Sequence, residues 1–173
     1  MEEGPVDEGS DPFCRIARGE LSAYFVYQDD DIMVILDHMP ISKGHLLVIT
    51  KRHYTAVEKV PPATLVKAWL TASALAKFYR EVAGAPGVNV GTNSGRPANQ
   101  VVFHFHIHVV PRWEPGPPRR GERHELTEGE AREVLAMTRQ AVPIIKEYLK
   151  VAEALSTQDP PHRAGSGMPS SAP

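Results

Sequence analysis

The most informative segment for the fold and the function of this chain is His104-Phe105-His106-Ile107-His108, which is followed by Val109 and Val110. Side chains alternate between the two faces of an extended strand, so the three histidines are expected to share one face and the apolar residues the other. We expect the apolar face to pack against a core and the histidines to be displayed as a row. An imidazole with an unperturbed pKa of ~6.5 is mostly neutral at neutral pH, so one ring can attack phosphorus while a neighbour carries a proton. A row of histidines also suits zinc or copper, which leaves metal binding open at this point.

The composition of the chain indicates a single globular domain and argues against a membrane protein or a protein that binds nucleic acid polymers. The chain has 173 residues, 42% of them hydrophobic, which is enough for one ordinary globular core. Its net charge of -2 gives no general attraction to a nucleic acid polymer or an anionic membrane. No apolar run reaches the ~18 residues of a membrane span, and the acidic N-terminus is unlike a targeting peptide. The single cysteine, Cys14, excludes an internal disulfide and fits a reducing compartment, so we expect a cytoplasmic protein, with the nucleus as the alternative.

Both ends of the chain differ in composition from its centre. Residues 1–12 carry five acids with few apolar groups, and residues 156–173 are rich in proline and serine. Such segments cannot bury enough surface to order themselves, so both are expected to be disordered tails. We expect one domain over residues 13–155.

Local patterns predict the elements of that domain. Strands are expected at residues 21–28, 32–39, 44–50, 88–93 and 101–110, and helices at 61–84 and 127–155. The run at 44–50 suits a strand buried on both faces, and Asp29-Asp30-Asp31 suits a hairpin turn. Pro143 is expected to kink the last helix, which opens with a capping box at Thr127. The result is an α+β fold, an antiparallel sheet of about five strands with two main helices.

Several motifs together resemble the histidine triad (HIT) family. The histidine strand resembles the family's His-φ-His-φ-His-φ-φ signature, and Gly44-His45-Leu46-Leu47-Val48-Ile49 resembles another of its strands. Residues 93–101 resemble its phosphate loop, and residues 13–20 its opening segment. The similarity covers residues 13–115, with the helix at 127–155 outside it. The resemblance implies an antiparallel sheet that pairs with a second subunit to form one continuous sheet in a homodimer.

The resemblance also implies catalytic roles for four histidines. His106 would be the nucleophile that attacks the α-phosphorus, and His108 would contact the phosphate or the leaving group. His104 and His45 would form the supporting network. The substrate implied is a purine nucleotide or a nucleotidyl small molecule, and no cofactor is implied.

Four further residues match the family's substrate-binding positions. Asp37 matches an acidic position that holds the ribose hydroxyls, because a carboxylate accepts hydrogen bonds from a cis-diol. Asn93 matches a position that contacts the phosphate region, and Gln100 with the amide of Val101 matches the turn that cradles it. A turn rich in backbone N–H groups binds oxyanions.

The chain departs from the family pattern at two places. Val101 stands where many members carry serine or threonine, so the side-chain hydroxyl that would contact the leaving group is missing. Asp11 stands where several relatives have the first cysteine of a Cys-x-x-Cys zinc motif, completed by histidines that match His53 and His104. An Asp11, Cys14, His53 and His104 site is chemically feasible, but we expect no metal and place His53 at a strand end on the surface.

The function implied is a hydrolase or transferase that cleaves nucleoside 5'-phosphoramidates or related nucleotidyl compounds through a covalent nucleotidyl-histidine. One alternative is a dinucleoside polyphosphate hydrolase, which uses the same nucleophile with a nucleotide as the leaving group. An alternative of another class is a non-catalytic scaffold module that binds nucleotides. The phosphate loop and the opening segment resemble the nucleotide-binding and phosphoramidase branch most.

Overall fold

The fold is an antiparallel sheet with helices on both faces. A computed structural model describes residues 9–115 and 123–157. The strands are β1 (Phe25–Gln28), β2 (Ile32–Leu36), β3 (Leu46–Thr50), β4 (Gly87–Gly91) and β5 (His106–Arg112), and they lie in the order β1-β2-β3-β5-β4. All neighbouring strands pair antiparallel, so the histidine strand β5 lies between β3 and the edge strand β4. This confirms the expected α+β class and the five-stranded sheet.

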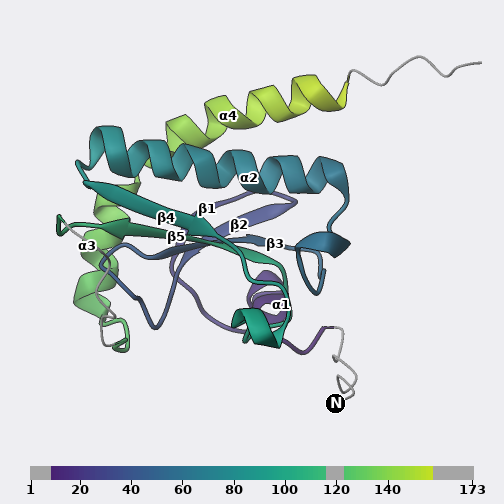
Figure 1. Ribbon diagram of the computed structural model, residues 1–173, viewed down its shortest axis with the longest axis horizontal. Helices are drawn as coiled ribbons and strands as arrows, with labels where there is room; N and C mark the ends of the chain where they lie inside the picture. The colour runs from purple at the N-terminus through teal and green to yellow at the C-terminus, as the bar shows by residue number, and fades with distance from the viewer. Residues whose placement is uncertain (1–8, 116–122, 158–173) are drawn as a thin grey trace, which may run out of the picture.

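In the described part of the chain, four α-helices pack around the sheet, as Figure 1 illustrates. They are α1 (Pro12–Ala17), α2 (Pro62–Lys77), α3 (Glu128–Thr138) and α4 (Ala141–Ser156). α2 lies along one face of the sheet with α4 outside it, whereas α1 lies against the other face (Figure 1). α2 continues as a wider π turn, Phe78–Val82, and short 3-10 turns occur at Val57–Lys59 and Arg96–Ala98. Within residues 9–115 and 123–157, no helix has the length and apolar character needed to cross a membrane.

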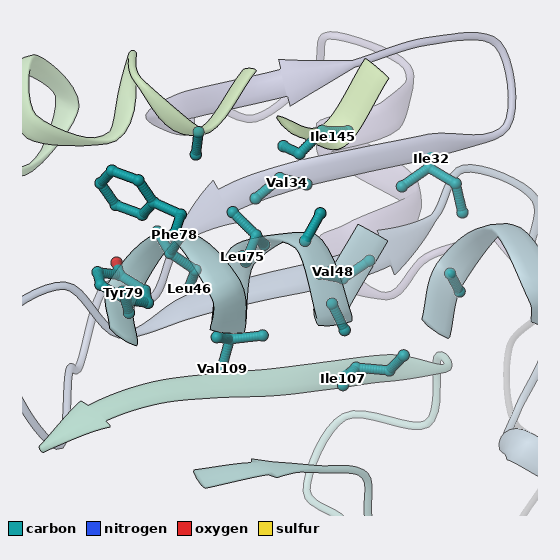
Figure 2. Close-up of a cluster of buried hydrophobic side chains, with 14 of the residues drawn as sticks. Ile32, Val34, Leu46, Val48, Leu75, Phe78, Tyr79, Ile107, Val109 and Ile145 are labelled. Atoms are coloured by element: carbon teal, nitrogen blue, oxygen red, sulfur yellow. The ribbon is translucent and has the colours of Figure 1, made fainter. Parts of the chain in front are cut away.

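Two apolar layers bury the central strands on both faces. The larger layer packs strand residues such as Val34, Val48 and Ile107 against Leu75 of α2 and Ile145 of α4 (Figure 2). The smaller layer packs α1 against the opposite side chains of the same strands: Phe13, Ile16, Met33, Ile35, Leu47, Ile49. Every residue of β2 and β3 is buried, as expected for a strand at 44–50 with two covered faces.

The predicted C-terminal helix is two helices, so the expectation of one helix over 127–155 was wrong. The capping box at Thr127 and Glu130 is present and starts α3. α3 ends at Thr138, and α4 begins at Ala141. Pro143 lies in the first turn of α4, where a missing N–H is tolerated, whereas a continuous helix would bring its ring against the carbonyl of Arg139. The proline therefore starts a new helix instead of bending one.

The strand at 101–110 and the N-terminal boundary also differ from expectation. β5 begins only at His106, because residues 101–105 form an irregular segment. Asp11 is the N-cap of α1 and Pro12 its first residue, so the ordered domain begins before the expected boundary at 13. Of the predicted tails over residues 1–12 and 156–173, residues 1–8 and 158–173 lie outside the described residues.

Candidate functional site

His106 has the hydrogen-bond pattern of a nucleophile with a free ring nitrogen. Its Nδ1 donates to the carbonyl oxygen of His104 at 2.7 Å, which places the proton on Nδ1 and leaves a lone pair on Nε2. Burial lowers the pKa of His106, although the bond to the His104 carbonyl opposes this effect. The hydroxyl of Thr92 donates to the His106 carbonyl at 2.6 Å, and the Phe13 ring packs against the imidazole edge-on, with 5.0 Å between ring centroids. The imidazole of His106 is therefore neutral at neutral pH, and the His104 carbonyl and the Phe13 ring fix its orientation.

His45 and His108 form a second pair whose protons are placed the other way. The amide of Ile41 donates to Nδ1 of His45 at 3.2 Å, and His45 Nε2 lies 2.9 Å from His108 Nδ1. Burial lowers the pKa of His45 to about 3 and that of His108 to about 4, so both rings are neutral at neutral pH. A neutral His45 that accepts at Nδ1 must donate from Nε2, and His108 must then carry its proton on Nε2. His106 thus offers a lone pair at Nε2, and His108 offers an N–H at Nε2. The centroids of the two rings are 4.9 Å apart.

Asp37 lies beside this pair. Its carboxylate Oδ2 is 3.5 Å from His45 Nε2, and its Oδ1 accepts from the amide of Met39 at 2.8 Å. The residue is buried at the end of β2, not solvated as an ordinary strand-end charge would be. Oδ2 keeps acceptor capacity for a ligand hydroxyl.

A glycine and a tyrosine fix the turn that leads into His45. Gly44 has φ of +92°, and a Cβ there would come within 2.9 Å of the Tyr79 hydroxyl oxygen. That hydroxyl donates to the Gly44 carbonyl at 2.5 Å, and Tyr79 is fully buried. The helical spacing identified Tyr79 as a core residue but gave no sign of this contact with the site.

The loop at residues 93–101 is held by its own hydrogen bonds. The Gln100 side chain is buried, accepts from the amide of Gly95 at 2.8 Å and donates to the carbonyls of Thr55 and Val102. Gln100 therefore shapes the loop through its side chain, and the role of this turn as a phosphate cradle stays a prediction. Asn93 also braces the loop, because its Nδ2 donates to the Asn99 carbonyl at 3.3 Å.

Val101, close in sequence to β5, has a backbone N–H that can bind a ligand. Among residues 9–115 and 123–157, no partner accepts a hydrogen bond from the amide of Val101, whose side chain is 86% exposed. Gly95 has φ of +84° and Asn99 has φ of +68°, which turns the chain sharply before this point. The amide of Val101 is thus unpaired among the described residues, and its role in binding an oxyanion stays a prediction.

His104 does not belong to the displayed row. It is fully buried, and its Nε2 donates to the Thr50 carbonyl at 2.6 Å. α1 covers this end of the sheet, so Phe13 and Cys14 take the place of solvent. The expectation of three displayed histidines was wrong, because His106 is buried as well and only His108 is partly exposed, whereas Phe105, Ile107 and Val109 do lie in the core on the opposite face.

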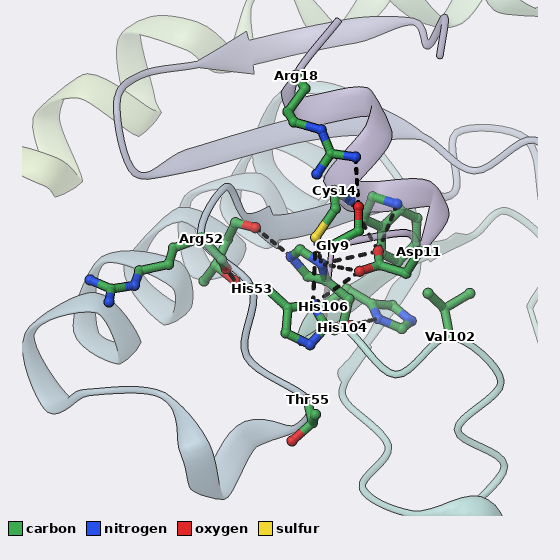
Figure 3. A network of polar contacts seen from close by, with 12 residues as sticks. Gly9, Asp11, Cys14, Arg18, Arg52, His53, Thr55, Val102, His104 and His106 are labelled. Atoms are coloured by element: carbon green, nitrogen blue, oxygen red, sulfur yellow. Dashed lines mark hydrogen bonds and ion pairs between the residues drawn. The ribbon is translucent and has the colours of Figure 1, made fainter. Parts of the chain in front are cut away.

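Asp11, Cys14, His53 and His104 meet under α1 (Figure 3). Asp11 accepts from His53 Nδ1 at 2.9 Å and lies 3.1 Å from His104 Nδ1. Cys14 Sγ is 3.5 Å from His53 Nδ1 and 3.4 Å from His104 Nδ1. The His53 side chain is only 15% exposed, so its expected place on the surface was wrong.

The same contacts shift two of the pKa values. Burial opposes ionisation of Asp11, but hydrogen bonds with His104 and Cys14 outweigh it and hold the pKa of this carboxyl well below its usual range. Burial and the neighbouring Asp11 raise the pKa of the Cys14 thiol to about 12.

Two groups of side chains have the donor atoms for a metal. Zinc is bound by thiolate, imidazole and carboxylate, and the ligand atoms of Asp11, Cys14, His53 and His104 all lie within 4.8 Å of one another. These residues fit zinc. Asp37, His45 and His108 also converge, but His45 Nε2 and His108 Nδ1 bond to each other. Two donor atoms of this second group are therefore already engaged with each other.

Comparison with known proteins identifies the family of the chain. The HIT domain family matches residues 18–114, and the chain belongs to the HIT domain family. An adenylylsulfatase of Arabidopsis thaliana, HINT3, is 38% identical over 102 residues, which are 59% of this chain and 52% of that protein. This chain thus spans about half the length of that relative.

Solved structures resemble the fold closely. A hypothetical histidine triad nucleotide-binding protein from Sulfolobus tokodaii has a TM-score of 0.69 and 31% identity, covering 78% of this chain and 93% of that one. A Zn-bound histidine triad family protein from Mycobacterium smegmatis has a TM-score of 0.67 and 34% identity, covering 78% and 96%.

Proposed function

We propose that this protein is a nucleotide-binding hydrolase or transferase that cleaves nucleoside 5'-phosphoramidates and related nucleotidyl compounds through a covalent nucleotidyl-His106. The observation that carries the proposal is the set of hydrogen bonds made by two neighbouring rings, from which opposite tautomers are assigned to His106 and His108. His106 presents an unprotonated Nε2, whereas His108 presents an Nε2–H. Nucleophilic displacement at phosphorus requires this combination of a lone pair and a donor.

The proposed reaction has two steps. His106 Nε2 attacks the α-phosphorus, a P–N bond forms, and the bond to the leaving group breaks with its electron pair remaining on that group. The N–H of His108 donates to the leaving group, and the amide of Val101 donates to the phosphate oxygens. Water or another acceptor then attacks phosphorus and gives up a proton that restores the Nε2–H of His108, the P–N bond breaks with its electron pair returning to His106 Nε2, and the mononucleotide leaves.

In this proposal, residues beside the histidines bind the substrate. Asp37 would accept hydrogen bonds from the ribose hydroxyls of a purine nucleotide, and Asn93 would act next to the phosphate. A homodimer in the cytoplasm that pairs through a sheet edge is part of this proposal. Adenylyl sulfate is a second candidate substrate, because the Arabidopsis relative named adenylylsulfatase is 38% identical.

A partition experiment tests the covalent step. Three substrates that share an adenylyl group but differ in the leaving group, an amine, a sulfate and a nucleotide, are turned over in water that contains methanol. A shared adenylyl-His106 predicts one ratio of adenosine 5'-methyl phosphate to AMP for all three. Direct attack by solvent predicts a ratio that depends on the leaving group, and that result would reject the proposal.

Matched variants complete the test. His106→Ala should abolish turnover of all three substrates without unfolding the protein. His124→Ala is the control, because His124 is exposed and contacts only the helix cap through Glu130 among the described residues. Equal losses in the two variants would point to a general effect of removing a histidine.

A further inference from the structure

The turn that leads into His45, residues 42–44, is hydrogen-bonded to distant parts of the chain. We infer that these hydrogen bonds, which we call the turn anchor, position the His45–His108 pair, and that Tyr79 is a positioning residue for the cleavage of bonds to basic leaving groups. The effect on His45 stands on its own, whereas the effect on cleavage rests on the proposed function.

Two bonds of the turn anchor connect the turn to the end of β5. The Ser42 hydroxyl donates to the carbonyl of Pro111, within β5, at 2.5 Å. Nε1 of Trp113, the residue directly after β5, donates to the Lys43 carbonyl at 2.7 Å. The turn before β3 is therefore fixed to the strand that carries the other two histidines of the site, and not only to its own hairpin.

The third bond comes from the end of α2 and is buried. Tyr79 lies fully buried in the larger core layer beside Phe78 (Figure 2), and its hydroxyl donates to the Gly44 carbonyl at 2.5 Å. α2 widens at this point into the π turn Phe78–Val82, a rare feature that occurs frequently at functional sites. Because the Tyr79 side chain is shielded from water, no solvent molecule replaces its hydroxyl as the donor.

The anchored turn sets the tautomer of His45. The His45 amide donates to the Ser42 carbonyl at 3.0 Å, and the Ile41 amide donates to His45 Nδ1 at 3.2 Å. The second distance is already at the long end of the range for such bonds, so a small shift of the turn breaks it. Without it, the proton of His45 is free to occupy either nitrogen, and His108, 2.9 Å from His45 Nε2, no longer keeps its own proton on Nε2.

The expected defect depends on the leaving group. An amine leaves as a basic nitrogen and needs a donor, whereas a sulfate leaves as a stable anion and needs one far less. Tyr79→Phe removes only the hydroxyl, so it should lower kcat for an adenosine phosphoramidate by about 10-fold or more while KM changes little. Turnover of adenylyl sulfate should fall by less than about 3-fold.

A matched pair of variants tests this selectivity. Tyr27→Phe is the control, because it also removes one hydroxyl hydrogen bond, from Tyr27 to Asp29 at 2.9 Å on the hairpin. Circular dichroism and urea unfolding check that both variants fold. Where Tyr79→Phe fails to fold, Trp113→Phe removes the donor to the Lys43 carbonyl and takes its place in the test.

We expect the selective loss in the anchor variant and none in Tyr27→Phe. Equal losses for the two substrates in Tyr79→Phe, or no loss for the phosphoramidate, would overturn the role in cleavage, because a general weakening of the fold does not discriminate between leaving groups.

Nitrogen NMR of the His45 ring tests the positioning itself. The ring should carry its proton on Nε2 in wild type and in Tyr27→Phe, and it should show a mixture of tautomers in the anchor variant. An unchanged tautomer there would overturn the inference. A tautomer that changes in a protein whose wild type turns over no nucleotide would refute the proposed function and leave the positioning of His45 standing.

Discussion

Replacing His45 by glutamine should remove much of the acid sensitivity of this fold. The His45 side chain is fully buried, with the Ile41 amide at Nδ1 and His108 at Nε2. Glutamine offers an oxygen and an N–H in similar positions, but it does not titrate. The variant therefore keeps the packing and loses only the ionisation.

The size of the effect follows from the two pKa values of His45. Burial lowers its pKa to about 3 in the folded protein, whereas an unfolded histidine titrates at ~6.5. Between these values the unfolded chain binds more protons, so stability falls as pH decreases through this window and is unaffected above it. At about pH 5, roughly 1.5 units below the unfolded value, the loss is about 2 kcal/mol.

Urea unfolding at about pH 8 and about pH 5 measures this difference. Wild type should lose about 2 kcal/mol more than His45→Gln between the two conditions. His124→Gln, which alters an exposed histidine, should follow wild type. Parallel losses in wild type and His45→Gln would refute the claim that His45 is buried in its neutral form.

Four further predictions concern single positions. The apparent pKa of the acid limb in a pH profile of kcat/KM should lie below the ~6.5 of free imidazole, because burial lowers the pKa of His106. An apparent pKa above this value would contradict the prediction. Gly44→Ala should cost more than ~1 kcal/mol in urea unfolding, because φ is +92° and the new Cβ meets the Tyr79 hydroxyl, and an unchanged midpoint would contradict this. Thr127→Ala should cost ~1 kcal/mol through loss of the capping box, whereas Thr127→Ser should restore it. Asp37→Ala should remove the preference for ribose over 2',3'-dideoxyribose substrates, a factor of roughly 10–100 in kcat/KM, and a preference that persists would remove Asp37 from ribose binding.

Alternation and hydrophobicity predicted the sheet well. The apolar run at 44–50 is β3, buried on both faces, and Ile107 and Val109 point into the core as the period of two requires. The pattern could not show where β5 begins or that α1 covers His104, because both depend on contacts between distant segments. Asp11 and His104 are 93 residues apart.

The sequence also could not predict which ring nitrogen of each histidine carries the proton. Three histidines at alternate positions predicted catalysis, but which nitrogen is free depends on the His104 carbonyl for His106 and on the Ile41 amide for His45. Thr92, whose hydroxyl anchors the His106 carbonyl, carried no signal at all, since threonine is common at the end of a strand. Motif spacing predicted which residues form the candidate site, whereas their hydrogen-bond partners depend on how distant segments pack.

The central claim, a covalent bond between nucleotide and His106, is tested most directly by intact-mass spectrometry. Wild type and His106→Ala are quenched in alkali, which preserves a histidine phosphoramidate, during turnover of an adenosine phosphoramidate. The account predicts a mass increase of one adenylyl group on wild type and none on His106→Ala. Turnover by wild type without an adduct, or an adduct of equal yield on His106→Ala, would contradict it.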